Sequence, residues 1–193
     1  MSVGQDGEKY AKRVYAKRVV MEIKRYNIAL LSIGRPEAYI QIANLLFKPY
    51  AQSYLLGPDS LPHITLCQFL AQSSNIFDLI PDLEHADQRP PVHLTGLRFS
   101  NKHHSNLWGA SLSVKRSPEL MKLQAFVVDL LSHHRLSPLN PVGELYVPHL
   151  TLARVNCIQV KNFPKDIFID DLFNLALGDS DELGQFTKIL HLF

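Results

Sequence analysis

The stretch that decides the fold is Pro-His-Leu-Thr-Leu at residues 148–152, because nearly the same five residues, Pro-His-Ile-Thr-Leu, also stand at residues 62–66. In both copies apolar and polar residues alternate, which is typical of a β-strand with one buried face. The histidine and the threonine therefore share one face of each strand, and the aliphatic residues share the other. If the two strands lie side by side, two imidazoles and two hydroxyls face one cleft.

The segments around the two copies also correspond, which indicates an internal repeat. Residues 27–33 and 107–114 predict strands, and each strand is followed by a proline-initiated helix and a loop that leads to the histidine motif. The repeat units span about 27–70 and 106–155. Such a repeat predicts a duplicated α+β fold with pseudo-twofold symmetry, in which equivalent strands lie against each other as in an isologous dimer.

Each unit contains one expected helix. In the first unit, apolar residues recur at helical spacing over residues 37–50. In the second unit, Ser117 is suited to cap a helix and Pro118 to begin it. The apolar face of the second helix is formed by Leu120, Leu123, Phe126, Val127, Leu130 and Leu131.

Outside these units the pattern predicts three more elements. A short helix is expected near residues 75–83, a strand over 92–99 and a final strand over 186–193. Residues 1–26 form a basic N-terminal extension, and residues 27–193 form one domain. The extension is interpreted either as a solvated or helical segment, which we favour, or as an arm that contacts RNA phosphates.

The composition bounds the class of protein. The chain has 193 residues and a hydrophobic content of 46%, which is ordinary for a soluble globular protein. Its formal net charge of +2 argues against a strong overall electrostatic field that would attract duplex DNA. Its two cysteines, Cys67 and Cys157, form neither a disulfide framework nor a metal-ligand pattern. There is no apolar run of membrane-spanning length and no signal-peptide core, so a cytoplasmic protein is expected.

The paired motifs resemble those of the two-histidine (2H) phosphoesterases, and the sequence is most similar to their LigT-like branch of RNA 2',3'-cyclic phosphodiesterases. His63-Ile-Thr-Leu with Phe69 resembles the first motif of that branch, and residues 148–154 resemble the second. The layout of residues 95–97, 107–108 and Gly184 also fits, so that the resemblance covers roughly residues 27–193. It implies a two-lobed LigT-like fold with antiparallel sheets around a central cleft and helices on the outside.

The chemistry of the four shared side chains agrees with this resemblance. His63 and His149 can act as general base and general acid near neutral pH without a metal ion or another cofactor. Thr65 and Thr151 can donate hydrogen bonds to phosphate oxygens. The sequence does not assign the acid and base roles to particular histidines.

Two further residues are candidates for the site. The resemblance implies a phosphate contact for Arg154, but strict alternation places Arg154 on the opposite face from His149, so that it reaches the cleft only past a bulge or at the end of the strand. Tyr146 could stack a base, although an aromatic residue there is more often part of the rim or core.

Other histidines have simpler interpretations. A lone His-x-Thr is more often a hydrogen-bonded core histidine, and we interpret the third example, residues 93–95, as an ordinary strand because it lacks the proline and the helix–loop unit. His133 and His134 lie near the expected end of a helix, where cations are favoured. His103 and His104 lie in a polar turn.

The sequence therefore predicts a phosphodiesterase that acts on a 2',3'-cyclic phosphate or a 2'-5' linkage of an RNA end or a nucleotide. We expect the protein to be a monomer and to have no membrane partner. Two alternatives stay open: a non-catalytic module that binds a nucleotide or RNA end, and an enzyme whose physiological direction is 2'-5' RNA ligation.

Overall fold

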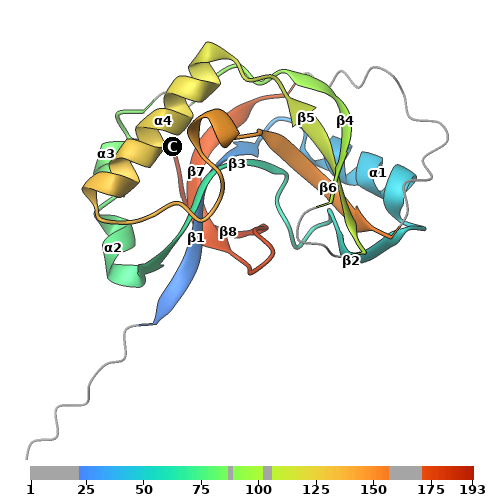
Figure 1. Ribbon diagram of the computed structural model, residues 1–193, viewed down its shortest axis with the longest axis horizontal. Coiled ribbons are helices and arrows are strands. Elements are labelled where there is room, and N and C mark those ends of the chain that lie inside the picture. The colour runs from blue at the N-terminus through green and yellow to red at the C-terminus, as the bar shows by residue number, and fades with distance from the viewer. Residues whose placement is uncertain (1–21, 87–88, 102–105, 157–170) are drawn as a thin grey trace, which may run out of the picture.

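The computed structural model describes residues 22–86, 89–101, 106–156 and 171–193. In chain order (Figure 1) its elements are β1 (Ile23–Ser32), α1 (Pro36–Phe47), β2 (Ala51–Leu55), β3 (His63–Gln72), α2 (Ser73–Phe77), α3 (Ile80–Leu83), β4 (Leu94–Ser100), β5 (Trp108–Val114), α4 (Pro118–His133), the 3-10 helix η1 (Gly143–Leu145), β6 (His149–Val155), β7 (Phe173–Ser180) and β8 (Phe186–Leu192). None of the described helices is both long and apolar enough to cross a membrane.

The strands form one antiparallel sheet in the order β4-β5-β6-β3-β1-β7-β8, and β2 also pairs with β6. The two strands that carry the repeated motif, β3 and β6, are neighbours at the centre, where Ile64 lies opposite Leu150. The sheet thus divides into one lobe of β4, β5, β6 and β2 and another of β3, β1, β7 and β8. This arrangement confirms the expected two-lobed α+β fold and the adjacency of the motif strands.

The helices of the two repeat units are exchanged between the lobes. Helix α1 follows β1 in the chain, yet it packs against β6 and β2, and α4 follows β5 but packs against β3. Figure 1 shows α1 beside the lobe of β4, β5 and β6, and α4 beside the lobe of β1, β3 and β7. Buried residues of both helices join the same apolar core as the strands of both lobes. The exchange ties the lobes together, because neither lobe can bury its sheet without the other unit's helix.

The two helices begin in different ways. The Ser117 hydroxyl accepts a hydrogen bond from the backbone N–H of Leu120 at 3.2 Å, which confirms the predicted cap of α4. In helix α1 the side chain at the N-cap position makes no such hydrogen bond. Instead, the Asp171 carboxylate accepts hydrogen bonds from the backbone N–H groups of Gly34 at 3.0 Å and Arg35 at 2.8 Å. Asp171, two residues before β7, therefore satisfies donors at the start of α1, which links the C-terminal segment to the first repeat.

Three expectations about elements need correction. Strand β1 begins at Ile23, so the sheet includes the last residues of the segment assigned to the basic extension. The single helix expected at 75–83 is two short helices, α2 and α3. Residues 51–55, expected as loop, form β2.

Strand β7 is a further element that the sequence analysis did not predict. It is buried along most of its length and lacks the alternation of a half-buried strand. The basic segment 1–21, the polar turn with His103 and His104, and Cys157 lie outside the described residues, so expectations about them stay predictions. Cys67 is buried, and burial raises the pKa of its thiol to about 12.

Candidate active site

The pairing of β3 with β6 brings the four motif side chains onto one face of the sheet. Because the strands are antiparallel and Ile64 lies opposite Leu150, His63 lies across from Thr151, and Thr65 lies across from His149. Ile64 and Leu150 are fully buried in the core. The histidines and threonines therefore face the opposite side, as the alternation predicted.

The two histidines are held in the same way. Nδ1 of His63 lies 2.7 Å from the carbonyl oxygen of Leu61, and Nδ1 of His149 lies 2.8 Å from the carbonyl oxygen of Val147. Each ring thus bonds to the carbonyl two residues earlier in its own chain. Since a carbonyl oxygen only accepts, Nδ1 carries a proton in both rings, and Nε2 is the nitrogen that can gain or lose one.

The surroundings of the two rings differ. His63 is 7% exposed, and its ring lies against that of Phe186 with the centroids 5.8 Å apart. Burial lowers the pKa of His63, while hydrogen bonds to the backbone of Leu61 and Gly184 and the charge of Asp181 act in the opposite direction. His149 is more exposed than His63. The two equivalent histidines are therefore suited to different protonation states.

Both motif strands contain a β-bulge at the same place. In β3, Thr65 pairs with Ala29 and Cys67 with Ile28, so Leu66 is the extra residue. In β6, Thr151 pairs with Ser111 and Ala153 with Ala110, so Leu152 is the extra residue. Each bulge shifts the alternation by one residue, because two residues of the bulged strand lie opposite one of the partner.

The bulges decide which later residues face the site. Leu152 and Ala153 are both buried, and Arg154 returns to the face of His149 and Thr151. Leu66 and Cys67 are likewise both buried, and Gln68 returns to the face of His63. The sequence pattern required a bulge before Arg154 for this side chain to reach the site, and β6 contains one. Gln68 holds the matching position in the first repeat, and no sequence signal had singled it out.

The hairpin turn between β7 and β8 lies over this face. The Gln68 side-chain N–H donates to the Gly184 carbonyl at 2.9 Å, and the Arg154 guanidinium donates to the Leu183 carbonyl at 3.3 Å. Asp181 of this turn and Phe186, the first residue of β8, also lie in the surroundings of His63. The turn therefore contacts side chains from both lobes of the site.

Asn27, a second residue that the sequence analysis missed, contacts Thr65. Its side chain on β1 is fully buried, and its Nδ2 donates to the Thr65 hydroxyl oxygen at 3.1 Å. In the second repeat the matching position, opposite Arg154 on β5, is Gly109, which has no side chain. A polar residue in a strand is the only sequence signal, and it becomes informative only once the register is known.

Tyr146 supports the same motif from the core side. Its hydroxyl donates to the backbone carbonyl of Thr65 at 2.8 Å, and the residue is 3% exposed. Burial raises the pKa of this phenol. A ring so deeply buried offers little surface for a nucleobase, so its position favours the core interpretation over the stacking one.

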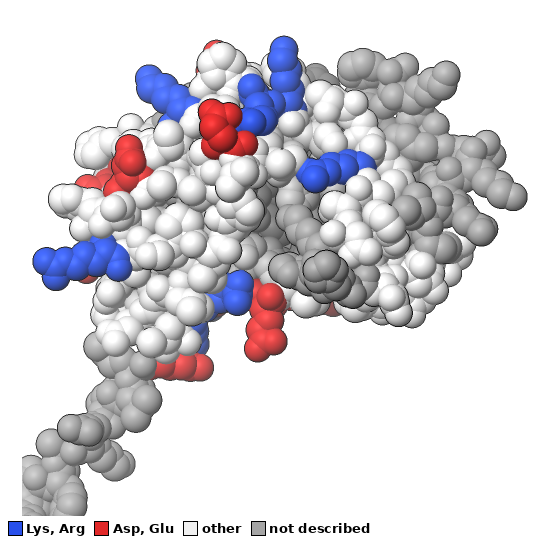
Figure 2. Space-filling view, in the orientation of Figure 1, with Lys and Arg blue, Asp and Glu red and all other residues white. Residues whose placement is uncertain are grey.

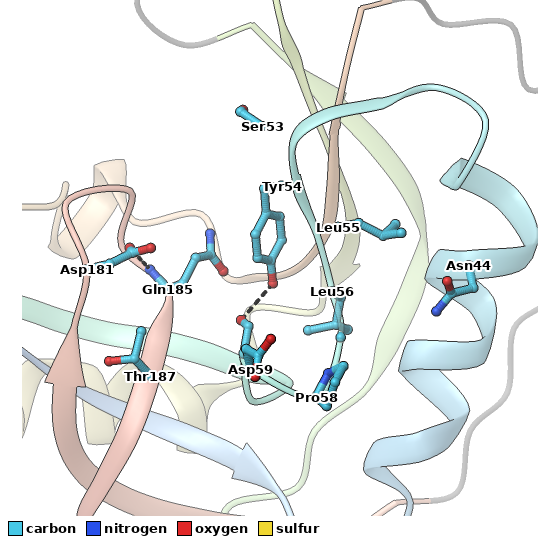
Figure 3. A pocket seen from close by; sticks show the side chains of 12 residues that line it. Asn44, Ser53, Tyr54, Leu55, Leu56, Pro58, Asp59, Asp181, Gln185 and Thr187 are labelled. Atoms are coloured by element: carbon cyan, nitrogen blue, oxygen red, sulfur yellow. Dashed lines mark hydrogen bonds between the residues drawn. The ribbon is translucent and has the colours of Figure 1, made fainter.

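A pocket of about 450 Å³ opens beside the Arg154 end of the site (Figure 3). Tyr54 lies opposite Arg154 in the β2–β6 pairing and therefore shares its face of the sheet. The Tyr54 hydroxyl is 2.9 Å from that of Ser60, and the Asp181 carboxylate accepts from the backbone N–H of Gln185 at 2.8 Å. The described lining includes the carboxylates of Asp59 and Asp181 but no lysine or arginine, so a phosphate is better suited to the histidine face.

The remaining histidine candidates lie elsewhere. The segment 93–95 overlaps the start of β4, at the edge of the sheet. At the end of α4, His134 contacts the Asp82 carboxylate at 2.9 Å.

Figure 2 shows the basic side chains of the visible face mostly scattered among neutral surface rather than forming a continuous band. Anion binding would therefore depend on the local donors of the site.

Comparison with known proteins yields structural matches. No family model and no curated protein matches the sequence. LigT from E. coli complexed with 3'-AMP is 16% identical, covers 89% of this chain and 97% of its own, and has a TM-score of 0.57. The phosphate complex of the same protein is 17% identical over the same shares with a TM-score of 0.54. A structure described as a phosphoesterase is 16% identical, covers 89% and 98%, and has a TM-score of 0.52.

The chain therefore has the α+β fold of LigT. This confirms, at the level of the fold, the resemblance that the paired motifs indicated. At these identities the agreement concerns architecture, and the roles of the site residues have to be argued from their geometry.

The different surroundings of the histidines give a testable titration. Because burial holds the pKa of His63 below 6.5, its folded form stays neutral while the unfolded chain takes up a proton, so its contribution to stability is present above pH 6.5 and is lost as the pH falls below that value. We expect an NMR titration of the ring protons to give His63 a midpoint below 6.5. A midpoint at or above 6.5 would contradict the described burial of the ring.

Proposed function

We propose that the protein is a phosphodiesterase that hydrolyses a 2',3'-cyclic phosphate or a 2'-5' linkage on RNA or a nucleotide by two-histidine acid–base catalysis. The observation that carries the proposal is the pairing of β3 with β6, which sets His63 and His149 on one face with Nδ1 of each ring bonded to a carbonyl. The shared fold with a LigT structure that binds 3'-AMP supports a nucleotide ligand.

The reaction needs one neutral and one protonated imidazole. In the proposed step, Nε2 of the neutral ring takes a proton from water, and the water oxygen forms a bond to phosphorus. The bond from phosphorus to one ribose oxygen breaks, and Nε2–H of the other ring gives its proton to that oxygen. The products are a phosphomonoester and a hydroxyl group, and the two histidines exchange their protonation states. No metal ion is required, and each proton transfer would contribute about 10²–10⁴ in rate.

The two surroundings suggest which histidine has which role. The lowered pKa of His63 favours the neutral form that a general base needs. We therefore assign His63 as the base and the more exposed His149 as the acid in the hydrolytic direction. In the ligation direction the roles reverse, by microscopic reversibility.

Thr65 and Thr151 would donate hydrogen bonds to the non-bridging oxygens of the phosphate, and Arg154 would add a charged contact. For Thr65 the direction of the donor is set by Asn27. Nδ2 of Asn27 can only donate, so the Thr65 oxygen accepts this bond and its own proton is left to be donated elsewhere. Asn27 is thus a positioning residue, because it acts through Thr65.

One observation favours the alternative of binding without turnover. The turn that carries Gly184 contacts the His63 ring, and its carbonyls accept the donors of Gln68 and Arg154. Because these contacts occupy donors of the site, the alternative in which the two histidines hold a phosphate in this same pocket without turnover stays open. Turnover measured beside calorimetric binding of 3'-AMP separates the alternatives, since binding without product would support the non-catalytic module.

The catalytic roles predict a strong effect of removing either imidazole. We expect His63→Ala and His149→Ala each to lower kcat for a nucleoside 2',3'-cyclic phosphate by at least about 100-fold, because each removes one proton transfer. His93→Ala is the matched control, since His93 begins the third His-x-Thr of the sequence and lies outside the site. Wild-type rates in both site variants would refute the proposed reaction.

The role of Asn27 predicts a coupling to Thr65. Asn27→Asp presents only acceptors to the Thr65 hydroxyl and would draw its proton away from the ligand, so we expect kcat/KM to fall about 10- to 100-fold. In a Thr65→Val background the same substitution should cost much less, because the hydroxyl that it redirects is gone. Equal losses in both backgrounds would show that Asn27 acts on stability alone, and thermal unfolding of each variant provides that comparison.

A further inference from the structure

Gln68 and Arg154 occupy equivalent positions in the two repeats. Each lies five residues after the motif histidine, and each follows a one-residue bulge that turns its side chain to the histidine face. One is a neutral amide on β3 and the other a guanidinium on β6. The repeat thus presents one N–H donor group from each lobe at the same face.

Both donor groups bind the same hairpin turn. Gln68 donates to the carbonyl of Gly184 at 2.9 Å, and Arg154 donates to the carbonyl of Leu183 at 3.3 Å. The Gly184 backbone also acts on the His63 ring, partly opposing the lowering of its pKa by burial. Two oxygens of adjacent residues therefore accept hydrogen bonds from side chains of both lobes, as two non-bridging oxygens of one phosphate would.

We propose that Gln68 is a ligand-binding residue, the counterpart of Arg154 in the first lobe, and that the carbonyls of Leu183 and Gly184 hold the places of phosphate oxygens until a ligand displaces the turn. This inference rests on the proposed function, because it takes a phosphate group as the ligand.

The construction of the turn fits such a displacement. The turn is closed by its own bonds, from the Gly184 N–H to the Asp181 carbonyl at 3.1 Å and from the Gln185 N–H to the Asp181 carboxylate at 2.8 Å, so its closure does not depend on the bonds to Gln68 and Arg154. Gly184 has a φ of +86°, which favours glycine, and a Cβ there would lie 2.4 Å from the Gln68 side-chain amide, so a larger residue would displace that amide.

Charge favours the exchange. The turn carries the carboxylates of Asp181 and Glu182 and offers neutral carbonyl oxygens to a guanidinium. A phosphate offers charged oxygens, and bonds between ionised groups are the stronger ones. The phosphate would also be repelled by the two carboxylates, so the bound state is expected to hold the turn away from the site.

The test is the affinity for inorganic phosphate, measured by calorimetry. Gln68→Glu replaces the donor by a charged acceptor of the same size, and we expect the Kd to rise at least about tenfold. Gln72→Glu is the matched control, because Gln72 lies on the same strand and the same face, at the far end of β3, and its Kd should change less than about twofold.

A second variant separates a lost contact from a changed field. Gln68→Met keeps the length of the side chain without charge or donor, and the Kd should still rise about threefold or more. Any of three results would overturn the inference. The first is a loss of phosphate affinity in Gln68→Glu but not in Gln68→Met, and the second is an equal loss of affinity in Gln68→Glu and Gln72→Glu. The third is wild-type affinity in both Gln68 variants. If Gln68→Glu fails to fold, the result for Gln68→Met decides.

The turn itself gives an independent readout, because in the wild-type protein the backbone amide signal of Gly184 should shift when phosphate binds. The proposed function can fail without this inference, since Gln68-dependent phosphate binding with no hydrolysis would refute the reaction alone. Hydrolysis with both Gln68 variants indistinguishable from wild type would refute the inference alone.

Discussion

The site depends on the antiparallel pairing of Ile64 with Leu150 at the join between the two lobes. Both side chains are fully buried, and a slip of one residue in this register would turn a whole motif from the site into the core. The exchanged helices reinforce the register, because α1 packs against β6 and α4 against β3. The distance between the histidines is thus set by the core rather than by loops, which suits a reaction that needs two groups on opposite sides of one atom.

The two lobes carry equivalent motifs, but the surroundings of these motifs differ. The first lobe surrounds its histidine with Phe186 and buries Asn27 against its threonine, and the second has Gly109 in place of Asn27. Gln68 in one lobe corresponds to Arg154 in the other. Different surroundings suit the proposed hydrolysis, because that reaction needs one imidazole to be neutral while the other is protonated.

The sequence predicted the features that repeat or follow local rules. The paired motifs, the capped helix after Ser117 and the final strand were all recoverable, because alternation and capping are properties of short stretches. Strand β7 was not predicted because burial on both faces removes the alternation of polar and apolar residues. The predicted start of β1 was several residues too far along the chain because the strand begins in a polar segment. The bulges after Thr65 and Thr151 were equally invisible, so neither the face of Gln68 nor the contact of Asn27 could be predicted. These features depend on register between distant strands, which one sequence does not encode locally.

The most direct measurement of the central claim is a crystal structure of the protein with bound inorganic phosphate. The account predicts one phosphate between β3 and β6, with Nε2 of both His63 and His149 within about 2.6–3.2 Å of its oxygens. A phosphate that contacts one imidazole alone, or that binds away from both rings, would contradict it.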